Sequence, residues 1–283
     1  MLKDYIALTK PRITWLILMS TGVGFFFGAK AGWHLLTLLH TIIGTGLIAS
    51  GTAALNQWYE READAKMRRT QGRPLPAGRL EAGKALAFAI AISAAGFAEL
   101  WLGANPLCAL LGLTTLLLYL FVYTPLKQRS PHSTTIGSIP GAMPPLIGFA
   151  AASGTLTWDA WVLFAILFLW QFPHFYAIAW MYKEDYARAG IRMLPVVEPD
   201  GKSTARRILL YSLALIPISL MPKFFAMAGN VYLYGALALG LAFLYYGLRI
   251  RTDRTRQQAR RVLLASVVYL PALFSLMLID RPA

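Results

Sequence analysis

Long apolar segments constrain the fold of this chain more than any other feature of its sequence. Nine of them follow one another, at residues 13–29, 35–55, 85–103, 105–124, 134–153, 157–181, 206–228, 231–248 and 262–279. Each is about 17 residues or longer, which is enough for a helix to cross the hydrocarbon core of a bilayer. None shows the strict alternation of a half-buried strand. The sequence therefore predicts an all-α polytopic membrane protein with nine transmembrane helices, in which residues 1–283 form a single integral-membrane domain.

The overall charge is strongly basic, but its distribution argues against a nucleic-acid-binding protein. Hydrophobic residues make up 57% of the chain and charged residues 14%, whereas a soluble domain carries about 25% charged residues. The net charge of +14 comes from Lys and Arg grouped in short loops between the apolar segments. Such grouping is typical of the positive-inside bias and also suits a polyanionic ligand. We therefore expect a lipid bilayer and an anionic substrate as partners, and no nucleic acid.

The positive-inside rule gives the orientation of the nine segments. With the N-terminus inside, the inner regions hold three Lys or Arg before the first segment, seven after the second, two after the fourth, six after the sixth and six after the eighth. Only Lys30, Lys223 and Arg281 of the 27 then lie outside. The seventh segment is the weakest, because it contains two prolines and Lys223, but without it the arginines between 249 and 261 would face outside. The sequence predicts a cytoplasmic N-terminus and a cytoplasmic site.

The loop after the second segment, residues 56–78, carries charges of both signs. Asn56, Glu60 and Asp64 are spaced four residues apart, so on a helix they lie along one face. Three oxygen-bearing side chains on one face suit a hard divalent cation, and Mg²⁺ takes one or two carboxylates with water and substrate phosphates. A loop whose only role was to set the membrane topology would need basic residues, but it would not need acidic residues spaced along one face of a helix. We interpret these three residues as a candidate metal and catalytic site.

Basic residues follow this motif at once and indicate a diphosphate ligand. Arginine binds phosphate in a bidentate manner, and lysine adds a point charge. The prolines Pro74 and Pro76 end any helix and shape the loop. The candidates for phosphate binding here are Lys66, Arg68, Arg69, Arg73 and Arg79.

Two further inner loops carry the same kinds of residue. The stretch 123–148 contributes Lys127 and Arg129, and the stretch 170–195 contributes cations together with carboxylates. Two acidic loops facing each other across a helical bundle suit a ligand whose diphosphate head meets the loops and whose apolar tail lies between the helices. We therefore expect a prenyl diphosphate. The polar residues of the second stretch are His174, Lys183, Glu184, Asp185, Arg188 and Arg192.

Several motifs resemble those of a known family. The pattern N-Q-x-x-E-x-x-x-D-x-x-M-x-R-T-x-x-R-P-L-P-x-G at 56–78 is similar to the first motif of protoheme IX farnesyltransferases (heme O synthases), which belong to the UbiA-type superfamily of intramembrane prenyltransferases. "YTPLKQR" and "GSIPGAMPPLIG" resemble the central region of that family, and "WQFPHFYAIAW" and "AGIRMLPVV" resemble its third region. The resemblance covers roughly residues 5–280.

This resemblance implies nine helices in a ring around a central cavity, in the bacterial cytoplasmic (inner) membrane. It implies transfer of the farnesyl group of farnesyl diphosphate to a vinyl group of heme B, with addition of water, to give heme O and diphosphate. Mg²⁺ would be the cofactor and heme B a substrate. The product would serve a terminal oxidase directly or as the precursor of heme A, so heme A synthase and terminal oxidase assembly are expected partners.

Matched residue by residue, the resemblance places Asn56, Glu60 and Asp64 in the first metal–diphosphate motif. Tyr123 and Lys127 match the Y-x-x-x-K of the loop after the fourth segment, which implies a substrate-binding tyrosine and a catalytic lysine.

Asp185 matches an acid of the second metal motif, where the chain departs from the wider superfamily. Quinone-type members carry D-x-x-x-D, whereas this chain has Met181 four residues before Asp185 and Ala189 four residues after it. We interpret Asp185 as a catalytic residue and metal ligand, and the rest of the second metal site is completed differently from that of the quinone-type members.

Heme requires apolar walls, cations for its propionates and in many proteins an axial ligand for its iron. The chain has four histidines, at 34, 40, 132 and 174. His132, near the inner start of the fifth segment, is a candidate for substrate binding. His174, which follows Pro173 inside the sixth segment, is our hypothesis for the iron ligand, and a second role beside heme would be to orient the water that adds to the cation. The alternative is that His174 binds a backbone carbonyl freed by Pro173.

Other functions remain open on the residues alone. A membrane transporter would show an inverted repeat or matching broken helices, and no clear repeat is visible. Another intramembrane prenyltransferase, acting on a quinone precursor, would keep paired aspartates after the sixth segment. A CDP-alcohol phosphotransferase would carry D-G-x2-A-R followed by D-x3-D, which the sequence lacks.

Overall fold

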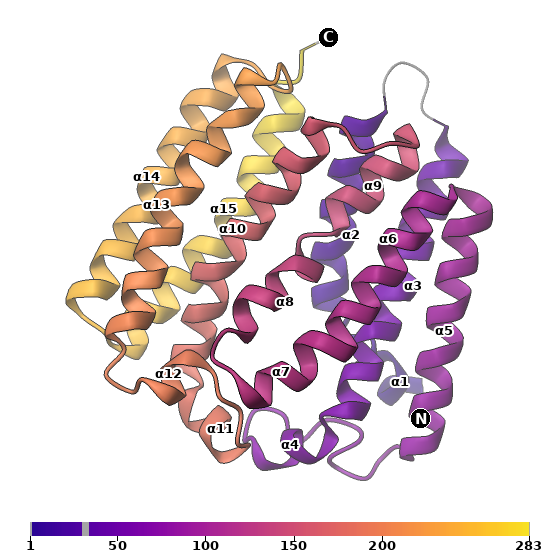
Figure 1. The fold of residues 1–283 in the computed structure, drawn as a ribbon, viewed down its shortest axis with the longest axis vertical. Helices are drawn as coiled ribbons and strands as arrows, with labels where there is room; N and C mark the ends of the chain where they lie inside the picture. The colour runs from indigo at the N-terminus through magenta and orange to yellow at the C-terminus, as the bar shows by residue number, and fades with distance from the viewer. Residues whose placement is uncertain (1, 30–33, 283) are drawn as a thin grey trace.

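The computed structural model describes residues 2–29 and 34–282, and every regular element within them is helical. Long helices lie side by side, and several of the short ones lie at one end (Figure 1). The long helices are α2 (Pro11–Gly28), α3 (Leu35–Tyr59), α5 (Ala82–Gly103), α6 (Pro106–Leu117), α10 (Trp158–Met181), α13 (Lys202–Phe224), α14 (Asn230–Thr252) and α15 (Arg256–Ile279). The shorter ones are α1 (Leu2–Leu8), α4 (Arg61–Lys66), the π-helical η1 (Leu118–Tyr123), α7 (Thr124–Arg129), α8 (Ser133–Gly141), α9 (Pro144–Ser153), α11 (Lys183–Arg188) and α12 (Leu194–Val197).

Eight candidate membrane spans confirm the predicted class. Within the described residues, eight helices are long and apolar enough to cross a membrane, and they correspond to the second to ninth predicted segments. Two of them are composite, because Pro106–Arg129 joins α6, η1 and α7, and Ser133–Ser153 joins α8 and α9. The first predicted segment corresponds to α2, an 18-residue helix that begins with Pro11 and Arg12 and is not among the eight. The count of nine spans therefore stays a prediction.

Glycines allow the backbones of α2 and α9 to lie in direct contact. Gly24 and Gly28 of α2 face Pro145 and Phe149 of α9, and Gly148 of α9 faces α2 in return. A methyl group at any of these glycines would overlap the facing backbone; at Gly28 it would lie 2.5 Å from the carbonyl oxygen of Phe149. Small residues spaced four apart permit this close packing of helices in membranes. The helix α2 is therefore packed into the bundle with the eight candidate spans.

The cationic loops gather at one end of the bundle. The helices α4, α7, α11 and α12 lie at this end, and the C-terminus lies at the other (Figure 1). Of the three cations predicted on the opposite face, Lys223 is in the last turn of α13, and Arg281 donates to the carbonyls of Phe26 (2.8 Å) and Ala29 (3.1 Å) at the end of α2. Lys30 lies outside the described residues. We call the end with α4, α7 and α11 the loop end.

A π-helical segment shapes the fourth span where it approaches the loop end. The chain passes from α6 through η1 directly into α7, which has Pro125 in its first turn. The Thr124 hydroxyl donates to the carbonyl of Tyr119 at 2.8 Å. π-Helical turns are rare and frequently lie at functional sites. The π-helical segment η1 ends at Tyr123, four residues before Lys127. It therefore sets the direction in which the side chains of Tyr123 and Lys127 leave the span.

Candidate active site

The three residues of the first acidic motif lie on successive turns at the loop end of α3. The helix α3 ends at Tyr59 and α4 begins at Arg61, so Glu60 lies at the break. Backbone hydrogen bonds continue through the break, from the Glu60 amide to the Asn56 carbonyl at 2.9 Å and from the Asp64 amide to the Glu60 carbonyl at 2.7 Å. Asn56, Glu60 and Asp64 are 2%, 3% and 1% exposed. The predicted register is thus present, and the whole motif is buried.

Glu60 pairs with Lys127, which α7 brings into the site. The Lys127 Nζ atom lies 2.7 Å from Glu60 Oε1 and 3.0 Å from Oε2. The same ammonium lies 5.4 Å from the centre of the Tyr123 ring, a cation–π distance. Burial by itself raises the pKa of the Glu60 carboxyl, but the charges of Lys127 and Lys10 bring that pKa below its usual value. Glu60 is therefore an ionised carboxylate at neutral pH.

Asn56 connects the N-terminal segment to the fourth span. Lys10 Nζ donates to Asn56 Oδ1 at 3.2 Å, and Asn56 Nδ2 donates to the Thr124 hydroxyl at 3.3 Å. Burial lowers the pKa of Lys10 to about 7, and the charge of Arg73 acts in the same direction while that of Glu60 opposes it. Lys10 thus adds a third cation to the acidic motif, and this cation gives up its proton more readily than a surface lysine does.

Asp64 presents a buried carboxylate oxygen without a partner. Arg73 Nη1 donates to Asp64 Oδ2 at 2.6 Å. The Thr70 hydroxyl donates to the backbone carbonyl of Asp64 at 2.9 Å and so holds the loop that carries Arg73. In the part of the chain that the structure describes, no hydrogen-bond donor reaches Asp64 Oδ1. A buried acceptor left unpaired costs about 1–3 kcal/mol, and more when it is charged. A cation at Oδ1 would remove that cost.

The donor set at Asp64 fits Mg²⁺ better than a metal that needs a complete protein cage. Within residues 2–29 and 34–282, no group of three or more His, Cys, Asp or Glu side chains is arranged to hold a metal ion. Mg²⁺ does not need such a group, because one or two carboxylates suffice when substrate phosphates and water complete its shell. Asp64 is the first candidate ligand, with Glu60 and the amide oxygen of Asn56 beside it.

Asp185 holds the basic loop after α4. Its carboxylate accepts the backbone amides of Arg68 at 3.2 Å and Arg69 at 3.3 Å, and it also pairs with the Arg188 guanidinium one turn later. Asp185 is buried. Both of its carboxylate oxygens are therefore engaged by protein donors, in contrast to Asp64. Asp185 stabilises the loop that follows the acidic residues of the first motif.

The remaining predicted cations divide between aromatic contacts and the surface. The Arg69 guanidinium lies 4.9 Å from the ring centre of Tyr182 and donates to the Tyr186 hydroxyl at 3.5 Å. Lys183 lies 4.3 Å from the ring centre of Trp180. Four predicted substrate-binding residues are exposed, namely Arg68, Arg69, Arg129 and His132.

A backbone contact joins the third loop to this site. The amide of Arg192, after α11, donates to the carbonyl of Lys127 at 3.1 Å. Together with the contacts of Asp185 to the Arg68 and Arg69 amides, this bond holds all three inner loops against one another. The result is a buried acidic motif surrounded by cations, an arrangement able to bind a divalent cation and a diphosphate together.

Comparison with known proteins assigns the chain to a family. The model of the UbiA prenyltransferase family matches residues 17–273. The chain belongs to the UbiA prenyltransferase family. This UbiA prenyltransferase is 67% identical over 290 residues to the protoheme IX farnesyltransferase of Solibacter usitatus (strain Ellin6076), with 99% of both chains covered. It is 50% identical to the protoheme IX farnesyltransferase of Koribacter versatilis (strain Ellin345), with 99% of this chain and 94% of the relative covered. The family predicted from the motifs is confirmed.

Solved structures of UbiA-type proteins share the fold at low sequence identity. A digeranylgeranylglyceryl phosphate synthase matches with a TM-score of 0.82 at 16% identity, over 99% of this chain and 98% of that one. A UbiA homologue from Archaeoglobus fulgidus bound to DMAPP and Mg²⁺ matches with a TM-score of 0.68 at 18% identity, over 98% and 99% of the two chains. These similarities establish the fold of this UbiA prenyltransferase.

Lys10 and Arg207 have side-chain hydrogen bonds within the bundle but were not among the predicted site residues of this UbiA prenyltransferase. Lys10 reaches Asn56 from the N-terminal segment. The position of Lys10 in the sequence could have predicted this contact. Lys10 directly precedes Pro11, near the start of the first apolar segment, and the predicted topology puts that start on the same side of the membrane as the acidic loop. Arg207 Nη1 donates to the Tyr176 hydroxyl at 3.0 Å, so Arg207 points from α13 toward α10. No sequence pattern separates Arg207 from the other basic residues near it.

His174 lies inside the bundle and contacts α15. Its Nδ1 is 2.8 Å from Ser266 Oγ, and its ring stacks on Trp170 with centroids 4.7 Å apart. Ser266 donates its single hydroxyl proton to the carbonyl of Leu263 at 2.6 Å, so we assign the proton between His174 and Ser266 to Nδ1, which leaves the lone pair on Nε2. The partner of His174 is therefore a side chain of α15, not a backbone carbonyl freed by Pro173.

Proposed function

We propose that this protein transfers the farnesyl group of farnesyl diphosphate to a vinyl group of heme B and adds water, giving heme O and diphosphate. The observation that carries the proposal is the buried Asp64 carboxylate with a free oxygen, flanked by Arg73 and near the Glu60–Lys127 pair, at the loop end of an apolar helical bundle. The name of its relatives at 67% and 50% identity supports the choice of donor and acceptor.

Departure of the diphosphate is the step that these residues assist. The allylic C–O bond breaks and its electron pair stays on the diphosphate oxygen, where negative charge increases. Lys127 and Arg73 lie fixed around the acidic motif, so they stabilise that charge without reorganising, and Lys10 contributes when it is protonated. Mg²⁺, when bound by Asp64 with Glu60 and Asn56, adds its own charge to that stabilisation.

Capture of the farnesyl cation needs no protein nucleophile. The electron-rich vinyl group attacks it and forms a new carbon–carbon bond, which leaves positive charge on the carbon next to the porphyrin. Water adds there and loses a proton, so donor, heme B and water account for all atoms of heme O and diphosphate. The single cysteine, Cys108, is buried in the fourth span and takes no part. The task of the bundle is to keep water away until the carbon–carbon bond has formed.

Product analysis tests this proposal directly. Purified protein incubated with heme B, farnesyl diphosphate and Mg²⁺ is expected to yield a species with the mass of heme O, together with diphosphate. Chelation of Mg²⁺ is expected to abolish the product. A quinone precursor supplied in place of heme B tests the alternative acceptor, and prenylation of that compound without any heme product would overturn the proposal.

We also propose nine spans, with α2 as the first, a cytoplasmic N-terminus and a cytoplasmic active site in the bacterial inner membrane. The close packing of α2 on α9 and the placement of the cationic loops at the loop end support this orientation. Heme O released into the membrane would pass to heme A synthase or to a terminal oxidase during its assembly.

Reporter fusions are expected to show this orientation. A reporter fused after Gly154, between α9 and α10, should lie outside, and one fused after Gly201, at the start of α13, should lie in the cytoplasm. The reason is that the basic residues of the inner loops resist translocation. Alkaline phosphatase and green fluorescent protein fusions provide the two readouts. Opposite signals at both positions would refute the orientation.

His174 is expected to be the axial ligand of the heme iron. Its hydrogen bond to Ser266 holds the ring and leaves Nε2 as the basic nitrogen, which is the form that binds iron. His174→Ala should therefore shift the Soret band of bound heme, while Ser266→Ala should keep ligation but weaken heme affinity. A Soret band and an affinity unchanged in His174→Ala would leave His174 with the structural role of linking α10 to α15.

A further inference from the structure

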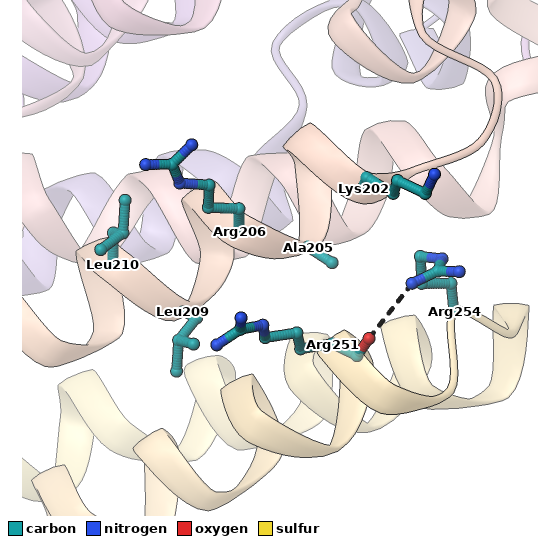
Figure 2. A pocket seen from close by; sticks show the side chains of 7 residues that line it. All are labelled: Lys202, Ala205, Arg206, Leu209, Leu210, Arg251 and Arg254. Carbon is teal, nitrogen blue, oxygen red and sulfur yellow. Dashed lines mark hydrogen bonds between the residues drawn. The ribbon is translucent and has the colours of Figure 1, made fainter.

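A basic pocket lies between α13 and α14 at the loop end, apart from the site described above. Figure 2 shows Lys202 and Arg254 at one end of the gap and Leu209 and Leu210 at the other. The cavity has a volume of about 340 Å³. Its lining consists of Lys202, Ala205, Arg206, Leu209 and Leu210 from α13, and of Arg251 and Arg254 from the end of α14 and the turn after it.

Acidic residues compensate only part of the positive charge of this pocket. Four of its seven lining residues are cationic and none is acidic. Lys202 pairs loosely with Asp200, at 3.6 Å, and Arg254 donates to the carbonyl of Arg251 at 3.3 Å. Within the described ranges of the chain, no carboxylate forms an ion pair with Arg206, Arg251 or Arg254. Four cations lining one cavity without an acidic lining residue give it a positive potential, which favours an anion.

An apolar stripe runs from the pocket along the membrane face of α13. Arg206, Leu210 and Leu213 are spaced four and three residues apart, so they lie along one face of the helix. Leu210 is 50% exposed and Leu213 is 52% exposed. On α14, the exposed Leu248 lies one turn before Arg251. Cations at the membrane surface with exposed leucines deeper in the same groove match a ligand with an anionic head and an apolar tail.

The two helices close the pocket one turn below the cations. Gly247 lies four residues before Arg251 on α14, and a methyl group there would lie 3.5 Å from the Cα of Leu209. Arg207, next to Arg206 in sequence, points the other way and donates to Tyr176. Arg206, which lines the pocket, and Arg207, which contacts Tyr176, therefore leave α13 in different directions.

We propose that this pocket binds an anionic phospholipid. Arg206, Arg251 and Arg254 hold the phosphodiester head, and an acyl chain lies along Leu210 and Leu213. Basic pockets between transmembrane helices on the cytoplasmic side bind headgroups of this kind. The helices α13 and α14 form one edge of the bundle, so they are in contact with the bilayer (Figure 1). A free phosphate ion would use the cations but not the leucines, which is why the structure favours a lipid. The bound lipid would connect α13 to α14.

Lipid retention measured by native mass spectrometry tests the proposal. The full-length protein in mild detergent is mixed with phosphatidylglycerol or phosphatidylcholine of the same acyl chains. The parent protein is expected to retain phosphatidylglycerol selectively. The double variant Arg206→Gln with Arg251→Gln is expected to retain at least about 10-fold less phosphatidylglycerol than the parent. Arg249→Gln is the matched control, because Arg249 is exposed on α14 two residues before Arg251 but does not line the pocket. It is expected to behave like the parent.

Several outcomes would overturn the proposal. Equal retention by the parent, the control and the double variant would show that the pocket binds no lipid. An equal loss in Arg249→Gln would assign retention to the general surface charge. Displacement of phosphatidylglycerol by inorganic phosphate would make this a site for free phosphate instead. If the double variant fails to fold, the two single variants are measured, and unchanged retention in both would reject the proposal.

Discussion

Replacing Asp64 with asparagine is expected to reduce turnover by about 10²- to 10³-fold, the loss typical of removing one preorganised charge-stabilising group. We propose that Asp64 binds the metal through Oδ1, which no donor of the described residues reaches, and that the neighbouring Arg73 binds the diphosphate. The variant should also need more Mg²⁺ for half-maximal turnover. Its heme affinity should stay unchanged, because the substitution removes a charge at the loop end and leaves the apolar walls intact.

Stability separates this functional effect from misfolding. An unpaired buried carboxylate oxygen is unfavourable in the protein without ligands, so Asp64→Asn is expected to leave the unfolding temperature within about 2–4 °C of the parent value. Glu62→Gln is the matched control, since Glu62 lies two residues earlier and its side chain is 84% exposed. It should keep parental turnover. Near-normal turnover of Asp64→Asn at limiting Mg²⁺ would refute the assignment.

Replacing Lys127 with methionine is expected to lower both stability and turnover. The substitution leaves the Glu60 carboxylate, whose side chain is 4% exposed, without the Lys127 cation that lies 2.7 Å away. Breaking a buried ion pair in this way costs about 3–5 kcal/mol. The variant should also require more farnesyl diphosphate, with little change in the heme requirement, because Lys127 is proposed to bind the diphosphate. Thermal unfolding in detergent and the two substrate dependences are the measurements.

A second substitution distinguishes the two roles of Lys127. Adding Glu60→Gln removes the unpaired charge, so the double variant should recover most of the lost stability but none of the turnover. The exposed pair of Lys84 and Glu81, 3.0 Å apart, is the matched control, and Lys84→Met should change neither property appreciably. A double variant as unstable as Lys127→Met would show that packing, not charge, is what Lys127 contributes at this position.

Local patterns in the sequence were sufficient to predict several parts of the structure. The segment 35–55 is apolar and long enough to span, and it lies within α3. The spacing of Asn56, Glu60 and Asp64 placed them on successive turns, and the backbone hydrogen bonds have that register. Both results follow from local properties of the chain. Lipid offers the backbone no hydrogen-bond partners, so an apolar segment forms a helix, and the helical repeat then determines which residues share a face. The motifs also identified the family, because they record residue types at specified spacings.

The partners of individual side chains were decided by the tertiary structure. Asp185 was predicted to bind metal, but in the fold its carboxylate accepts the backbone amides of Arg68 and Arg69. Whether it also binds metal stays a prediction. His174 was expected to act on heme or on a nearby carbonyl, and its ring contacts Ser266 of α15.

The physical reason is the range over which each kind of interaction acts. Helical segments form from local composition, so the sequence by itself determined the membrane class, the helical register of the acidic motif and the basic character of the inner loops. Which cation reaches which carboxylate depends on how the helices pack, and glycine contacts such as Gly24 on Pro145 set that packing. Lys10 at Asn56 and the basic pocket between α13 and α14 therefore appear only once the helices are assembled.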